Sequence, residues 1–173
     1  MKHIKANGTS PPDLESKEDK NSVGAVDVDG SVIQVLKEEA RKLGGQGVPV
    51  AIIDGFLLYS DEMKAVRDLF DVKLFLRTNY NTAKTRREAR SGYVTIEGFW
   101  ADPPGYVDKI VWPNYVKDHK FLFHDGDVDG ELDAEVLDRL GIEGMPRETQ
   151  GDMTGCLKWA YSIVSKALNQ LER

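Results

Sequence analysis

Apolar side chains occur in a few short runs, and these runs predict alternating strands and helices. The run over residues 48–54, Val-Pro-Val-Ala-Ile-Ile-Asp, lies between Gly47 and Gly55 and predicts a strand buried on both faces. Residues 72–76 predict a second strand. A helix that begins after Ser60 lies between them, with a buried stripe of Met63, Val66, Leu69 and Phe70. Strand, helix and strand in this order predict a parallel βαβ unit.

Helical spacing predicts further helices along the chain. The first begins at a capping box formed by Ser31 and Gln34 and ends at Gly44-Gly45. The next begins at Asn79 or Asn81, and another covers 115–120, before a third strand over 121–124. A last helix, predicted to pack on the sheet, carries an apolar stripe of Leu157, Tyr161, Val164, Leu168 and Leu171. The fold class is therefore α/β, with residues 1–30 a polar, disordered lead and 31–173 one domain.

Composition excludes several classes of protein. The net charge of −6 argues against a general nucleic-acid-binding role. The single Cys156 rules out an internal disulfide and suits a reducing compartment. No apolar run approaches the roughly 20 residues of a membrane span, and the first residues lack a signal-peptide core. These features predict a soluble protein of the cytoplasm, with the nucleus as the alternative.

Two groups of charged residues are candidates for chemistry. Asp54 follows an apolar run, where a carboxylate at the end of a parallel strand can hold Mg²⁺, although Asp-Gly is also a common turn. Residues 77–120 are locally basic, with eight Lys and Arg against five Asp and Glu. Arg86, Arg87 and Arg90 share one helix and could clamp phosphate oxygens, or could form a solvated face beside Glu88.

Residues 91–115 are rich in Gly, Pro and aromatic side chains and form a longer connection than a compact domain needs. A lid or binding loop is the interpretation that this length favours. Its aromatic residues could pack on a flat ligand ring or on one another. They are Tyr93, Phe99, Trp100, Tyr106, Trp112 and Tyr115.

Three segments, taken in order, resemble the nicotinamide riboside kinases, small P-loop kinases related to uridine kinase. They are Ile52–Tyr59, Arg86–Tyr93 and Pro103–Tyr115, within a likeness that covers roughly residues 48–126. The stretch Pro11–Asp19 resembles an insertion found in fungal members. The resemblance implies a three-layer fold, with a parallel sheet between helices and a lid around residues 77–118.

The resemblance also implies a reaction and residues for it. The family transfers the γ-phosphoryl group of ATP, with Mg²⁺, to the 5′-hydroxyl of nicotinamide riboside in NAD salvage. Asp54 stands at the position of an acid beside Mg²⁺. Arg86, Arg87 and Arg90 match lid arginines that meet the phosphates and the riboside. The substrate-binding residues implied are Tyr93, Tyr106, Asp108 and Trp112.

The family's phosphate-binding loop has no counterpart in these 173 residues. The motif Gly-x-x-x-x-Gly-Lys-Ser/Thr is absent, and Gly44–Gly47 follows a helix rather than a strand. The first strand and the segment carrying the catalytic base are also absent. We therefore expect a chain truncated at its amino terminus, poorly soluble or partly folded alone, and without meaningful kinase activity. The alternative is a non-catalytic module that binds a nucleoside or a protein; the oligomeric state stays open.

Overall fold

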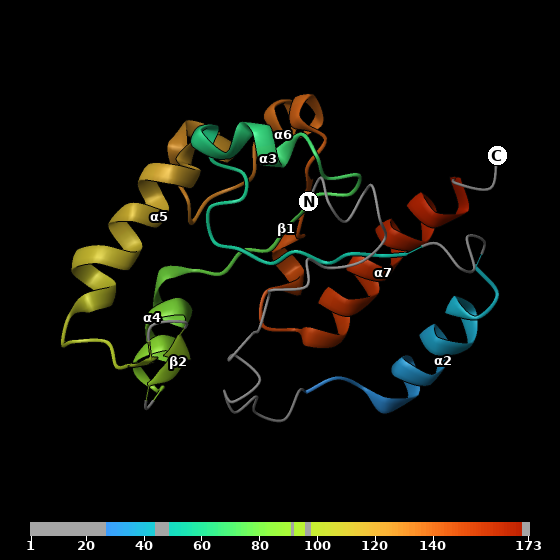
Figure 1. Cartoon of the computed structure of the whole chain (residues 1–173), viewed down its shortest axis with the longest axis horizontal. Helices are drawn as coiled ribbons and strands as arrows, with labels where there is room; N and C mark the ends of the chain where they lie inside the picture. Colours follow the sequence, from blue (N-terminus) through green and yellow to red (C-terminus); the bar gives the residue numbers. More distant parts are fainter. Residues whose placement is uncertain (1–26, 44–48, 91, 96–97, 171–173) are drawn as a thin grey trace. The chain divides into compact units, whose positions relative to one another are not determined.

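The computed structural model describes residues 27–43, 49–90, 92–95 and 98–170 (Figure 1). Within these residues the chain forms two compact units. The first contains residues 56–69 and 78–132, and the second contains residues 27–43, 49–55, 70–77 and 133–170. None of the helices in these ranges is both long and apolar enough to cross a membrane.

The first unit is built mainly from helical segments. It contains a 3₁₀ turn at Asp61–Met63 that continues into α3 (Lys64–Arg67), then α4 (Tyr80–Glu88). The hairpin strands β2 (Tyr93–Thr95) and β3 (Gly98–Trp100) follow, and then a π-helical turn at Val107–Val111 that runs into α5 (Trp112–His119). Two 3₁₀ turns, Lys120–Leu122 and His124–Gly126, complete the list. The buried apolar residues of this unit are Val107, Tyr115, Leu122, Phe123 and Val128.

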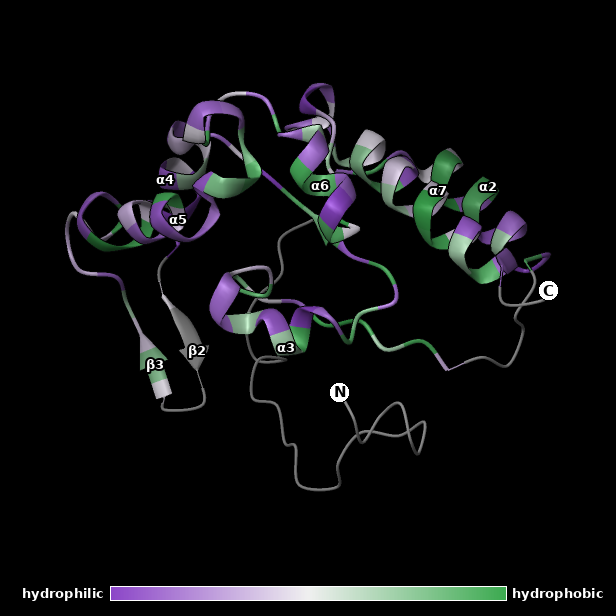
Figure 2. Ribbon diagram, turned by 90° about the horizontal axis from the view of Figure 1, so that it is seen from above, coloured by the Kyte–Doolittle hydropathy of each residue, from purple (hydrophilic) through white to green (hydrophobic). Residues whose placement is uncertain are grey.

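The second unit contains the parallel strands. They are β1 (Leu74–Phe75) and β4 (Glu143–Gly144), paired with Leu74 opposite Glu143. Its helices are α2 (Gly30–Ala40), α6 (Ala134–Leu140) and α7 (Met153–Gln170), with a 3₁₀ turn at Arg147–Thr149 before α7. Helices α2 and α7 contact each other, and both carry apolar residues, drawn green in Figure 2. The buried apolar residues here are Phe75, Leu137, Ile142 and Met145.

The predicted strand over residues 48–54 is wrong for the part that the structure describes. Residues 49–55 form neither helix nor strand, and their side chains are exposed. Ile52 is 89% exposed and Val50 60%. A strand is stable when a neighbouring strand satisfies its backbone groups, and no described strand pairs with this segment. The predicted βαβ unit is therefore not formed in the described residues, and β1 instead pairs with β4.

Two other expectations are wrong, and each error is local. The cap of α2 is Asp29, whose Oδ1 accepts hydrogen bonds from the backbone N–H and the hydroxyl of Ser31. A capping box based on Ser31 was therefore wrong. The predicted strand at 121–124 consists of 3₁₀ turns, and only Phe123 makes an isolated bridge, to Leu132. Helix α7 carries its predicted apolar stripe as far as Leu168, and Leu171 lies outside the described residues. The helix contacts α2 and the turn at 147–149.

The helix predicted to begin at Asn79 or Asn81 is confirmed. Asn79 caps α4, and its Oδ1 accepts a 2.9 Å hydrogen bond from the backbone N–H of Thr82. The described residues thus form a mixed α/β structure with one parallel strand pair. The expected three-layer parallel sheet is not seen among them.

Candidate functional site

Helix α4 brings the predicted arginines to the segment that contains residues 101–107. Tyr80, Lys84 and Arg87 occupy positions i, i+4 and i+7 and therefore lie along one side of this helix. All three reach carboxylates of the 102–108 segment. The side of α4 that faces its neighbour is thus polar and aromatic, and α4 has no buried residue.

Arg87 is held by Asp102. Its Nε donates to Oδ2 at 2.5 Å, and Nη2 donates to Oδ1 at 3.3 Å, which makes a two-point contact. The indole Nε1 of Trp100 also donates to Asp102, at 2.8 Å. The hydrogen bond from Arg87 is the main cause that lowers the pKa of Asp102, and the Trp100 bond and the charge of Arg90 act in the same direction. Asp102 is therefore ionised at neutral pH.

Asp108, predicted to bind substrate, contacts two side chains of α4. The Nζ of Lys84 lies 2.8 and 2.7 Å from its two carboxylate oxygens, and the hydroxyl of Tyr80 donates to Oδ1. The hydrogen bond from Lys84 is the main cause that lowers the pKa of Asp108. The bond to Asp108 raises the pKa of Lys84 and that of Tyr80. Both oxygens of Asp108 are therefore engaged within the unit.

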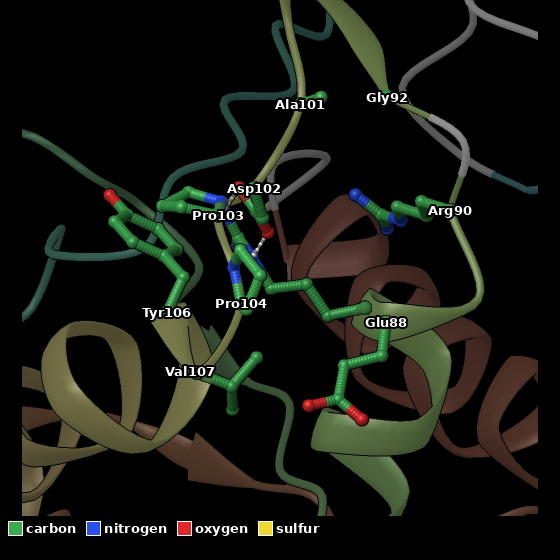
Figure 3. Close-up of a pocket in the computed structure, with 11 residues that line it drawn as sticks. Glu88, Arg90, Gly92, Ala101, Asp102, Pro103, Pro104, Tyr106 and Val107 are labelled. Carbon is green, nitrogen blue, oxygen red and sulfur yellow. Dashed lines mark hydrogen bonds and ion pairs between the residues drawn. The ribbon is translucent and has the colours of Figure 1, made fainter.

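A hollow of about 340 Å³ lies between the end of α4 and the following segment (Figure 3). Its charged and aromatic side chains come from Arg87, Glu88, Arg90, Asp102 and Tyr106, and Gly, Pro and Ala residues form much of the remaining wall. Arg90 extends toward the centre of the hollow, where Asp102 lies. Gly92, at φ +122°, forms one edge, and a Cβ there would lie 2.8 Å from the carbonyl oxygen of Trp100. Only glycine fits that position without displacing the backbone.

The three predicted arginines have different environments. Arg87 is half-buried and paired, whereas Arg86 and Arg90 are exposed. Within the part of the chain that the structure describes, neither Arg86 nor Arg90 makes a side-chain hydrogen bond or ion pair. Arg90 lines the hollow with Arg87, but Arg86 faces a separate shallow depression beside Asn81 and Thr85. The hollow therefore brings together Arg87 and Arg90, and it does not include Arg86.

The aromatic residues of the predicted lid largely pack on their neighbours. The Trp112 ring lies 5.2 Å from Tyr80 and 5.0 Å from Tyr115. The guanidinium of Arg87 lies 5.6 Å from the centre of the Tyr106 ring, a cation–π contact at the hollow. Tyr106 is therefore the predicted substrate-binding aromatic that the hollow includes. For Tyr93 the structure describes only the backbone, which pairs with Trp100 in the hairpin.

Asp54 belongs to the second unit, whereas the arginines belong to the first. Its side chain is exposed on the extended segment 49–55. In the described ranges, no group of three or more His, Cys, Asp or Glu residues could hold a metal ion. A single carboxylate suits Mg²⁺, which usually keeps several waters and takes its other ligands from phosphates. The chemistry of Asp54 fits that role, and the assignment stays a prediction.

Sequence reasoning missed Tyr80, Lys84 and Asp102. Tyr80, Lys84 and Arg87 have helical spacing, but two of them are charged, so they do not form the apolar stripe that indicates a buried helix face. Asp102 was visible only as an acid before Pro103-Pro104. Its partner is 15 residues away, and nothing in the local sequence indicates that pairing.

Comparison with known proteins identifies the family. No family model and no solved structure matches the chain. A nicotinamide riboside kinase of Schizosaccharomyces pombe is 39% identical over 169 residues, which cover 97% of this chain and 69% of that protein. Nicotinamide riboside kinases of Eremothecium gossypii and Saccharomyces cerevisiae are each 37% identical, over 81% and 61% of this chain and 56% and 43% of their own lengths.

These fungal relatives confirm the resemblance drawn from the three sequence segments. The chain spans between 43% and 69% of their lengths. The identity of 39% to the Schizosaccharomyces pombe kinase, over 69% of its length, is sufficient to assign the family. The chain belongs to the nicotinamide riboside kinase family.

Proposed function

We propose that this chain carries the arginine-bearing part of a site for ATP-dependent phosphorylation of nicotinamide riboside at its 5′-hydroxyl. The observation that carries the proposal is the hollow at the end of α4, where Arg90 has no side-chain partner among the described residues. The substrate is that of the fungal relatives, which are nicotinamide riboside kinases. NAD salvage in the cytoplasm is the corresponding cellular role.

Phosphate recognition in the hollow is the task of Arg90, whereas Arg86, which faces a separate depression, is assigned to the phosphates by the resemblance alone. Both are exposed, and a guanidinium can donate two parallel hydrogen bonds to phosphate oxygens. Arg87 contributes differently, because Asp102 already fixes its position and offsets its charge. It supports one wall of the hollow and stacks on Tyr106. Of the three predicted arginines, the hollow therefore contains Arg90, which is available to a phosphate, and Arg87, which is held by a carboxylate.

The riboside would use the polar and aromatic groups around Asp102. A carboxylate oxygen can accept hydrogen bonds from ribose hydroxyls, and the ring of Tyr106 offers a face for a planar cation such as nicotinamide. Trp112 is less suited to direct contact, because its ring packs against Tyr80 and Tyr115. Tyr93 remains a candidate on the resemblance alone.

The reaction forms a bond between the riboside 5′-oxygen and the γ-phosphorus and breaks the bond from that phosphorus to the bridging oxygen of ADP. A base takes the hydroxyl proton. Arginine side chains stabilise the charge of the phosphoryl group in flight, and Mg²⁺ neutralises charge on the phosphates when it is bound. Asp54 is the residue that we assign to Mg²⁺. The printed sequence holds neither the phosphate-binding loop nor the base segment, so we propose binding without meaningful turnover for these 173 residues.

Two measurements on the 173-residue protein test this proposal. Isothermal titration with ATP is expected to show binding that Arg90→Gln weakens about tenfold, since hydrogen bonds to charged groups contribute about 1.5–3 kcal/mol. Lys117→Gln removes an equal charge from an exposed position of α5 and is expected to leave the affinity unchanged. A coupled assay for ADP release with ATP, Mg²⁺ and nicotinamide riboside is expected to show no turnover.

Each result has a distinct meaning. Turnover near ~1 s⁻¹, ordinary for kinases, would show that the 173 residues are a complete enzyme. No ATP binding, or equal weakening by both variants, would refute the assignment of Arg90. Thermal stabilisation by nicotinamide riboside without any ATP binding would favour the second candidate, a nucleoside-binding module.

A further inference from the structure

Helix α4 carries Arg86 and Arg87, and Arg90 follows two residues after its last residue, but the helix lacks the apolar face that usually holds a helix in place. It has nine residues, Tyr80–Glu88, and none of them is buried. Isolated helices of this length are marginal in water, and most helices in proteins are held by an apolar face. The position of Arg86 and Arg90 must therefore depend on the polar contacts that α4 makes with the rest of its unit.

Two ion pairs join one side of α4 to the segment that forms the opposite wall of the hollow. Lys84 pairs with Asp108 at 2.7 Å, and Arg87 pairs with Asp102 at 2.5 Å. The sequence separations are 24 and 15 residues, so both are tertiary contacts. The Arg87 pair lies in the hollow, but Lys84 and Asp108 do not line it. Lys84 and Asp108 therefore make no direct contact with a phosphate bound in the hollow, and can affect it through their charge or through the placement of other groups.

Tyr80 adds a third group to the pair. Its hydroxyl donates to Asp108 Oδ1, and its ring meets the edge of Trp112. The Lys84 Nζ lies 3.4 Å from the same hydroxyl. Asp108 therefore accepts hydrogen bonds from two residues one turn apart on α4. These bonds restrain the rotation of the helix about its axis as well as its distance from Asp108.

We propose that Lys84, Asp108 and Tyr80 form a positioning cluster that orients α4, so that Arg90 and Arg87 face the hollow. Asp108 serves the site through α4 and makes no contact with substrate. The proposal rests on the proposed function for its ligand, a nucleoside triphosphate, while the geometry of α4 can be measured without ligand.

The contrasting explanation is an ordinary surface ion pair. The side chains of Lys84 and Asp108 are 30% and 39% exposed, and pairs with this exposure often contribute little to stability. For one variant, the two explanations predict opposite changes in the affinity for a triphosphate. Asp108→Asn removes a negative charge near the arginines, so electrostatics alone would strengthen the binding of a triphosphate. Loss of positioning would weaken it.

The experiment is titration of the 173-residue protein with ATP and with inorganic tripolyphosphate. For Asp108→Asn we expect about two- to thirtyfold weaker binding of both, the usual range for residues that act on a site indirectly. The control is Asp68→Asn, which breaks the exposed pair of Lys64 and Asp68 in the same unit and is expected to leave the affinity unchanged. Unchanged or tighter binding by Asp108→Asn would overturn the proposal.

A second variant separates positioning from general damage to the fold. Asp108→Glu keeps a carboxylate for both Lys84 and Tyr80, and we expect its affinity for ATP to stay within about threefold of the wild type. A loss of affinity in Asp108→Glu as large as in Asp108→Asn, with its circular dichroism unchanged, would contradict the proposal.

A ligand-free measurement covers the case in which the wild type binds no triphosphate. The Arg87 Nε–H gives a nitrogen–proton NMR signal that its bond to Asp102 protects from exchange. We expect this signal to be lost or to exchange faster in Asp108→Asn and to persist in Asp68→Asn. Absent ATP binding would refute the proposed function, and a persistent Arg87 signal in Asp108→Asn would separately refute the positioning cluster.

Discussion

Replacing Asp102 with Asn tests how strongly the wall of the hollow depends on one carboxylate. Asp102 accepts two hydrogen bonds from Arg87 and one from the Trp100 indole, at 2.5, 3.3 and 2.8 Å. Its side chain is 16% exposed and that of Arg87 is 28% exposed, so water screens the pair only in part. Hydrogen bonds to charged groups contribute about 1.5–3 kcal/mol each, and Asn keeps one acceptor oxygen. We expect the variant to lose about 1–2 kcal/mol of unfolding free energy.

The loss should depend on pH in a defined direction. The pKa of Asp102 is lowered in the folded protein, so its contribution to stability is complete above the pKa of the unfolded chain, about 3.9. It is lost as the pH falls through the folded-state pKa. The difference between the wild type and Asp102→Asn should therefore be full near about pH 7 and shrink by about pH 3.

The assay is urea unfolding followed by tryptophan fluorescence at both pH values. Trp100 reports directly, because its indole donates to Asp102. Asp54→Asn is the matched control, since this carboxylate is exposed. If Asp102→Asn lowers the unfolding free energy by less than about 0.3 kcal/mol at neutral pH, which is within the usual scatter of surface substitutions, the hydrogen bonds of Asp102 do not stabilise the fold as we infer. An equal cost at both pH values would refute the part that depends on ionisation.

Two further predictions concern the first unit's core and the exposed apolar segment. His119 is 3% exposed, and its ring nitrogens each lie 2.9 Å from a carbonyl oxygen, those of Tyr115 and Phe56. His119→Phe should keep the stacking on Tyr115 but leave both oxygens without this partner, at a cost of about 1–3 kcal/mol in thermal unfolding. No change in stability would mean that these contacts are unimportant. Ile52 is 89% exposed beside other apolar side chains, so Ile52→Lys should raise the protein concentration at which light scattering begins. The same onset for both proteins would show that this segment does not drive association.

Helix α4 shows how far local sequence determines structure in this chain. The capping amide of Asn79 and the helix-forming residues after it are neighbours in sequence, so the pattern of residues predicted the helix and its start. The same holds for α7, whose apolar stripe has the helical period. The family could also be identified from sequence, and the fungal relative that is 39% identical over 169 residues confirms it.

The segment 49–55 shows the limit of that reasoning. Its apolar residues predict a buried strand, but a strand becomes stable only through hydrogen bonds to another segment, and no described strand supplies them. The contacts of Arg87 and Asp108 show the same limit. Both residues are predicted to bind ligands, and the tertiary structure also pairs them with Asp102 and Lys84, 15 and 24 residues away, which no local pattern indicates.

Sequence by itself determined the helices whose caps and stripes are local, the basic character of residues 77–120 and the family of the chain. Only the tertiary structure decided which arginines have carboxylate partners and which remain available to an anion. The physical reason is that charged residues on exposed surfaces follow no period that reveals a distant partner. Their pairing depends on where the folded backbone brings them, and in α4 that pairing separates Arg87 from Arg86 and Arg90.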